Sequence, residues 1–176
     1  MDVMLTLVGP DEAHVLRHLF VAYFYDMSQY DDNLVINRHG LPVWALGGLE
    51  PEETPRTFEE CARFNWWVRD ECEQYLIRAD GRLAGFTIIA CAPMPHMPAG
   101  VDYELMDFYI APPFRRQGVG RRAAPLAFDL HRGGWVVYQL ARNLPARAFW
   151  QGAVSAYTAG HYTNLQGGTE QRFRND

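Results

Sequence analysis

The spacing of hydrophobic and polar positions changes several times along the chain, and each spacing predicts one kind of element. Residues 4–8 form a short apolar run that a Gly-Pro pair ends, which predicts a first strand. Apolar positions then recur at helical spacing as far as Tyr25, which predicts a helix with Asp11 as its N-cap. The stretch 26–48 is polar and irregular, so no element is expected there.

A second helix is predicted where Thr57 and Glu60 have the spacing of a capping box, and it should run to about Asp70. An Asp-Gly pair further on is typical of a tight hairpin turn. The remaining predicted elements are strands at 75–78, 85–91 and 102–110, a helix at 118–132, a strand at 135–140, a helix at 143–157 and a last strand at 169–173.

This order of elements predicts an α/β fold with a mixed sheet. The hairpin makes most of the sheet antiparallel, and the strand-helix-strand unit from Asp102 to Leu140 adds a parallel pair if its strands are neighbours. Helices are expected on both faces of the sheet. The length of 176 residues and the absence of an internal repeat favour a single domain over residues 1–176.

The amino-acid composition limits the kinds of partner that the chain is expected to bind. The hydrophobic fraction is 48% and the aromatic fraction 14%, as in globular proteins. The net charge is −5 and no Lys/Arg block is present, so no nucleic-acid partner is expected. The apolar runs are too short to cross a membrane, and the start of the chain lacks the pattern of a signal peptide, so no membrane partner is expected.

Cysteine and histidine usage gives no metal or disulfide pattern. Cys61, Cys72 and Cys91 are odd in number and scattered, which predicts reduced thiols in a cytoplasmic protein. His14 and His18 are four residues apart, but no third ligand accompanies them, so no metal is expected.

One segment carries candidate chemistry. Residues 115–120, Arg-Arg-Gln-Gly-Val-Gly, join the end of a predicted strand to the start of a predicted helix. Free N–H groups and the helix dipole attract phosphate there, and the glycines permit close approach. A solvated basic turn is the alternative. Gly-Lys-Ser/Thr of a P-loop is missing, and Ala123 stands where the dinucleotide fingerprint needs a third glycine.

With this context, the sequence resembles the GNAT acetyltransferases. Arg115-x-x-Gly118-x-Gly120 resembles the Q/R-x-x-G-x-G/A signature of that family, and Asn143-x-x-Ala146-x-x-Phe149-Trp150 resembles its second motif on the coenzyme A side. The resemblance extends from Asp102 to Tyr157, about a third of the chain, and implies a GNAT-like fold with acetyl-CoA as co-substrate. The cofactor-binding residues that it implies are Phe108, Tyr109, Ile110, Arg115, Arg116, Gln117, Gly118, Val119, Gly120, Arg121 and Asn143.

Within this set, the resemblance implies pyrophosphate on the amides of residues 117–121 and pantetheine along the backbone of residues 108–110. Asn143 would lie near the pantetheine, and it is equally suited to cap the helix that follows; the two roles are compatible.

Acetyl transfer to an amine also needs a base, and two carboxylates precede the phosphate-binding segment. Glu104 and Asp107 fall where members of the family carry acidic residues, and we favour Glu104. Strand alternation places the two on opposite faces unless a bulge intervenes, and an ordinary hydrogen-bonded carboxylate is the alternative for each. The family often has a tyrosine as general acid where this chain has Trp150, so no acid is identified.

The resemblance therefore implies an enzyme that moves an acetyl group to a primary amine of a small molecule or peptide, with dimers common in the family. One alternative is a non-catalytic acyl-CoA-binding or sensing module, which Trp150 favours. A nucleotide-binding protein unrelated to coenzyme A is a third hypothesis.

Overall fold

The computed structural model describes residues 1–64 and 71–176, which belong to two compact units. One unit combines residues 1–7 with 71–176, and the other spans 8–70. The second unit is therefore inserted in the sequence between the first strand of the sheet and the strand that pairs with it.

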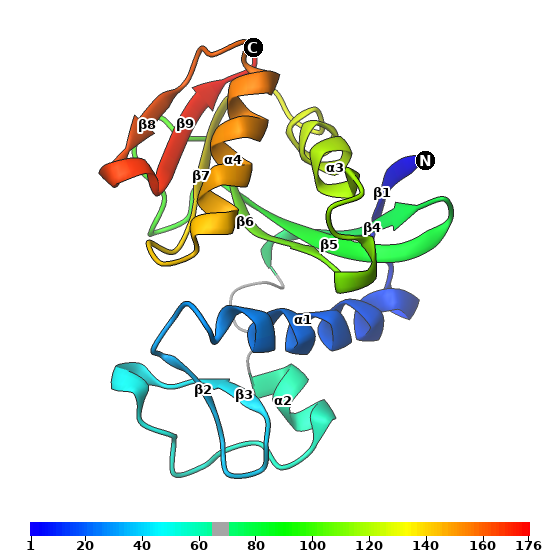
Figure 1. Cartoon of the computed structure of the whole chain (residues 1–176), viewed down its shortest axis with the longest axis vertical. Helices are drawn as coiled ribbons and strands as arrows, with labels where there is room; N and C mark the ends of the chain where they lie inside the picture. Colours follow the sequence, from blue (N-terminus) through cyan, green and yellow to red (C-terminus); the bar gives the residue numbers. More distant parts are fainter. Residues whose placement is uncertain (65–70) are drawn as a thin grey trace. The chain divides into compact units, whose positions relative to one another are not determined.

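The first unit contains a seven-stranded sheet with the order β1-β4-β5-β6-β7-β9-β8 (Figure 1). Every neighbouring pair is antiparallel except β6 and β7, so the predicted mixed, mostly antiparallel sheet is confirmed. In sheet order, the strands are β1 (Val3–Leu7), β4 (Glu73–Ala79), β5 (Arg82–Cys91), β6 (Tyr103–Ile110), β7 (Gly134–Tyr138), β9 (Glu170–Arg174) and β8 (Thr163–Leu165).

Two helices cover one face of this sheet. Helix α3 (Val119–Phe128) connects the parallel strands β6 and β7, and α4 (Leu144–Tyr157) follows β7. Large apolar side chains from both helices and the sheet form the core between these layers, because each element buries its apolar face there. The aromatic members of that core are Phe128, Trp135, Trp150 and Phe173.

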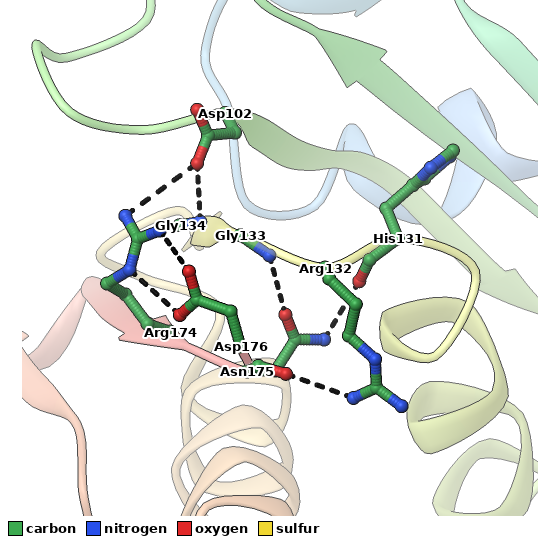
Figure 2. A network of polar contacts seen from close by, with 8 residues as sticks. All are labelled: Asp102, His131, Arg132, Gly133, Gly134, Arg174, Asn175 and Asp176. Carbon is green, nitrogen blue, oxygen red and sulfur yellow. Dashed lines mark hydrogen bonds and ion pairs between the residues drawn. The ribbon is translucent and has the colours of Figure 1, made fainter.

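Helix α3 ends at Phe128, four residues before the predicted end, and polar contacts take over the chain beyond it. The Asn175 side chain donates to the backbone carbonyls of Phe128 and His131 and accepts from the N–H of Gly133. Figure 2 shows this network, in which Asp102 accepts from the N–H of Gly134. The C-terminal residues thus fix the loop between α3 and β7.

The second unit contains helix α1 (Ala13–Met27), strands β2 (Leu34–Ile36) and β3 (Pro42–Trp44), and helix α2 (Phe58–Phe64). Asp11 is not the N-cap of α1, which was a wrong prediction: the Gly-Pro pair starts a short 3-10 turn over Pro10–Glu12, and the cap position falls on Glu12. The capping box is confirmed, since Glu60 N–H donates to Thr57 Oγ1 (3.2 Å) and Thr57 N–H donates to Glu60 Oε2 (3.3 Å). The predicted end at Asp70 lies outside the described residues.

The hairpin of β2 and β3 lies in the stretch where no element was expected. Asn37 organises its turn, because Asn37 Oδ1 accepts from the N–H groups of His39 and Leu41, each at 2.9 Å. Strands of three residues are too short to show a period, which is why the pattern missed them. None of the helices in the described part of the chain has the length and hydrophobicity to cross a lipid bilayer.

Candidate active site

The turn between β6 and α3 contains several backbone donors that have no partner within the helix. The first helical hydrogen bond runs from Arg122 N–H to Gly118 C=O (3.1 Å). The N–H groups of residues 118–121 precede it, and a helix start gives such donors no partner within the helix. The dipole of α3 adds positive potential at the same end, so this turn suits an anion such as a phosphate.

The two glycines of the turn have different roles. Gly118 is the N-cap of α3 with φ +85°, a left-handed conformation that favours glycine, and a Cβ there would meet nothing within 4 Å. A Cβ on Gly120 would lie 3.2 Å from the Phe149 ring and 3.6 Å from Ile110. Gly120 therefore permits α3 to pack against α4, whereas sequence reasoning assigned both glycines to the approach of phosphate.

The basic side chains of the turn also divide into two kinds. Arg115 folds back on the protein: its Nε donates to the carbonyl of Ile110 (2.6 Å), and its guanidinium lies over the Tyr109 ring at 5.3 Å. Arg115 thus braces the turn against the end of β6. Arg122 also contacts the protein, because its guanidinium donates to the carbonyl of Met1 (3.3 Å), while the side chains of Arg116 and Arg121 are exposed.

Strands β6 and β7 separate beside this turn. They pair only from Tyr103↔Trp135 to Leu105↔Val137, while β6 continues to Ile110. Ala111 N–H donates to Ala84 in β5, and backbone groups alternate along a strand. The backbone groups of Phe108 and Ile110 therefore face the edge that β7 has left. Arg115 occupies the Ile110 carbonyl, so an extended ligand can pair with the Phe108 groups and the Ile110 N–H.

A β-bulge in β6 brings the two candidate carboxylates onto one face. Ile88 is opposite Asp107 and Ile89 is opposite Leu105, so Met106 is an extra residue in the ladder. The bulge reverses the alternation, and Glu104 and Asp107 then share a face. Opposite faces were expected of a regular strand, and the bulge is the exception that this expectation allowed.

Glu104 is buried, and two neighbouring side chains shift the pKa of its carboxyl group in opposite directions. Burial raises the pKa of its carboxyl group, His96 lowers it, and the nearby Asp107 raises it. His96 Nε2 lies 2.8 Å from Glu104 Oε2, and 45% of the His96 side chain is exposed. Sequence reasoning missed His96, whose only signal was a histidine inside the proline-rich segment before the strand.

Asn143 is the N-cap of α4, as one of its two predicted roles required. Its Oδ1 accepts from the N–H of Ala146 at 3.1 Å, and the side chain is buried. The amide group is therefore fixed at the start of α4, in the segment that follows β7.

Comparison with protein-family models shows in which family these features occur together. A model of the acetyltransferase (GNAT) family matches residues 39–153, which include the turn, the bulged strand and most of α4. The chain belongs to the GNAT family of acetyltransferases. The GNAT resemblance, the fold class and the expectation of an acyltransferase are thereby confirmed.

Solved structures agree with this GNAT fold at low sequence identity. Aminoglycoside acetyltransferase AAC(6′)-Ib, in complex with ribostamycin and coenzyme A, has a TM-score of 0.61 and 10% identity, with 99% of this chain and 94% of that chain covered. An acetyltransferase from Thermus thermophilus has a TM-score of 0.53 and 20% identity, with 99% of this chain and 97% of that chain covered. A spermidine N-acetyltransferase from Vibrio cholerae has a TM-score of 0.55 and 10% identity, with 98% of this chain and 93% of that chain covered. No curated protein matches by sequence.

In this GNAT chain, Trp150 is a core residue. It is 5% exposed and packs edge-on against Phe108, with ring centroids 5.0 Å apart. An indole N–H does not supply a proton at neutral pH. Tyr157 is also engaged elsewhere, because its hydroxyl donates to Asp129 Oδ1 at 2.8 Å.

Proposed function

We propose that this acetyltransferase moves the acetyl group of acetyl-CoA directly to a primary amine of a small molecule or peptide. The GNAT family membership supports acyl transfer, and two proteins of similar fold are named for amine substrates, an aminoglycoside and spermidine. The net charge of −5 is compatible with a cationic acceptor.

For the cofactor, we assign the pyrophosphate to the amides of residues 117–121 and the exposed Arg116 and Arg121. The free edge of β6 at residues 108–110 would pair with the pantetheine arm, and Asn143 would contact the same arm. Arg115 would act by bracing the turn, since its guanidinium already contacts Ile110 and Tyr109. The bound coenzyme would supply an activated thioester at the opening between β6 and β7.

The observation that carries the proposed mechanism is the buried pair of carboxylates on one face of the bulged strand. An amine attacks only as a neutral nitrogen, so a base must remove a proton from it. Burial and Asp107 raise the pKa of the Glu104 carboxyl group toward neutrality, which improves a base at physiological pH. His96, half exposed beside Glu104, would pass the proton to solvent.

Acetyl transfer by this route conserves atoms and charge. Glu104 takes one proton from the ammonium group, the neutral nitrogen bonds to the acetyl carbon as the carbon–sulfur bond breaks, and the nitrogen then releases its second proton to water. The coenzyme A thiolate leaves and takes a proton from water. No protein acid is assigned, because Trp150 cannot serve and Tyr157 bonds to Asp129.

The test is a coenzyme A release assay on polyamines, aminoglycosides, amino acids and peptides. Glu104→Gln should lower turnover by about 10²–10⁴-fold, the range of general base catalysis, while the acetyl-CoA dissociation constant stays unchanged. Asp129→Asn, at an exposed carboxylate after α3, is the control. Full turnover in Glu104→Gln would remove Glu104 from the mechanism, and an absence of turnover on every amine in the wild type would contradict the proposed reaction.

A further inference from the structure

Three side chains that are far apart in the sequence meet beside the end of α3. Glu73 opens β4, Cys91 closes β5, and His131 lies in the loop between α3 and β7. Glu73 pairs with Ile89 and Cys91 pairs with Tyr103, and both partners pack in the core under α3 and α4. The three side chains therefore lie on the helix-covered face of the sheet.

Their donor atoms are close enough to share a ligand. His131 Nε2 lies 2.7 Å from Glu73 Oε2, and one donor atom from each of the three residues lies within 4.8 Å of the others. The side chains are 34% exposed for Glu73 and 24% exposed for His131, and Cys91 is half-buried. Solvent and small ions can thus reach the cluster without opening the core.

Neighbouring groups hold the cluster in place. The Tyr75 hydroxyl donates to Glu73 Oε2 at 2.8 Å, and the Tyr103 ring stacks on the His131 imidazole with centroids 4.5 Å apart and planes 9° apart. Figure 2 shows that Asn175 holds the backbone carbonyl of His131 while the imidazole points away from that network. Such supporting contacts are typical of metal sites, where they orient the ligands.

We propose that Glu73, Cys91 and His131 bind one Zn²⁺ ion. A thiolate, an imidazole nitrogen and a carboxylate oxygen are the three ligand types that zinc uses in proteins. A donor set with sulfur and nitrogen selects zinc over Mg²⁺ and Ca²⁺, which prefer oxygen. Residue spacing predicted no metal motif, because the ligands come from three separate elements.

The geometry needs only a small closure around the ion. Zinc bonds of about 2.0–2.3 Å place tetrahedral ligand atoms about 3.5 Å apart. The separations, none of which exceeds 4.8 Å, must therefore shorten by at most about 1.3 Å, and the 2.7 Å between His131 Nε2 and Glu73 Oε2 must lengthen. Side-chain rotation of the half-exposed residues can supply this. Water completes the fourth position, because the cluster faces solvent. The ion would join β4, β5 and the loop after α3, and so stabilise the sheet unit.

Titration calorimetry of the reduced protein with Zn²⁺ alone tests the site, with Mg²⁺ as the comparison ion. We expect saturable binding of one Zn²⁺ and a higher melting temperature, with neither effect from Mg²⁺. Cys91→Ser and His131→Gln should each weaken Zn²⁺ binding by about tenfold or more, and Tyr75→Phe by about tenfold as a supporting contact. Cys72→Ser is the matched cysteine control and should bind as the wild type does.

Replacement of Zn²⁺ by Co²⁺ gives a second readout that does not depend on stability. Thiolate ligation should produce a charge-transfer absorption band in the wild type that Cys91→Ser lacks. Circular dichroism checks that each variant is folded. Unchanged Zn²⁺ affinity in Cys91→Ser, or no saturable binding in the wild type, would overturn the site. Neither readout contains acetyl-CoA or an amine, so the result is independent of the proposed reaction.

Discussion

At the scale of single residues, the pKa of Glu104 depends on two neighbours that act in opposite directions. Asp107 raises it by repulsion, because a second negative charge disfavours ionisation, and His96 lowers it. A base works only when deprotonated, so this pKa should set the acidic limb of the kcat/KM profile. Asp107→Asn should lower the pKa and move that limb to lower pH. His96→Gln should raise the pKa and move the limb to higher pH.

Rate measurements across the pH range on a single amine check both shifts. His161→Gln, which replaces an exposed histidine in the segment before β8, is the control and should leave the limb in place. Shifts of the same sign in both variants would contradict this account of the charges. Loss of all activity in Asp107→Asn alone would instead identify Asp107 as the base.

The conformation of Gly118 gives a second test at residue scale, aimed at the cofactor. Gly118→Ala places a Cβ in open space but forces alanine to φ +85°, which costs about 1–2 kcal/mol. Relaxation of that strain would displace the amides at the start of α3. The acetyl-CoA dissociation constant should therefore rise about tenfold, which corresponds to about 1.4 kcal/mol.

Gly152→Ala is the matched control for this variant. Gly152 is exposed within α4, and a Cβ there meets nothing within 4 Å, so the change should stabilise the helix by about 0.5–1 kcal/mol without affecting the cofactor. Gly120 is unsuitable for the test, since a side chain there strikes Phe149 and would change packing as well as binding. Equal acetyl-CoA affinity in Gly118→Ala and wild type would show that this turn does not bind the cofactor.

At the scale of elements, the start of α4 has one observed role, the cap, and one proposed role, contact with the cofactor, and substitution can separate them. Asn143→Ala removes the side-chain cap on Ala146 N–H and should cost about 1 kcal/mol of stability. Asn143→Ser keeps a capping oxygen but loses the amide that would contact pantetheine. Denaturant unfolding should show a loss of stability mainly in the alanine variant, whereas acetyl-CoA affinity should fall in both. Unchanged acetyl-CoA affinity in Asn143→Ser would show that Asn143 only caps the helix and does not contact the cofactor.

The success of sequence-based prediction also varied by element. Long periodic stretches predicted α4, and paired turn residues predicted the hairpin of β4 and β5. The three-residue strands β2, β3 and β8 were missed, because so few positions define no period. The end of α3 was predicted too late, since the polar contacts that Asn175 makes there come from the far end of the sequence.

The parts of the candidate site also differ in how far the sequence predicts them. Its turn of backbone donors between β6 and α3 was predictable, because all of these donors come from one short segment whose composition is unusual. The shared face of Glu104 and Asp107 was not, since one bulged residue, Met106, reverses every later side chain and leaves no composition signal. The contact of His96 with Glu104 depends on the path of a loop, which propensities do not determine.

At the scale of the whole molecule, the two compact units raise the question of how far they unfold together. Both chain ends of the unit at 8–70 attach to paired strands, since Leu7 at the end of β1 is opposite Tyr75 in β4. The family model begins at residue 39, inside this inserted unit, and continues into the sheet. We propose on these grounds that residues 1–176 act as a single domain.

Differential scanning calorimetry tests this last proposal together with the cofactor. A single domain should unfold in one transition whose calorimetric and van't Hoff enthalpies agree. Acetyl-CoA at about 100 times its dissociation constant should add about 2.7 kcal/mol and raise the whole transition, because it binds only the folded state. ATP and NAD serve as controls and should leave the transition in place. Two separate transitions, of which acetyl-CoA moves one, would show that the cofactor stabilises the sheet unit alone and that the chain comprises two domains.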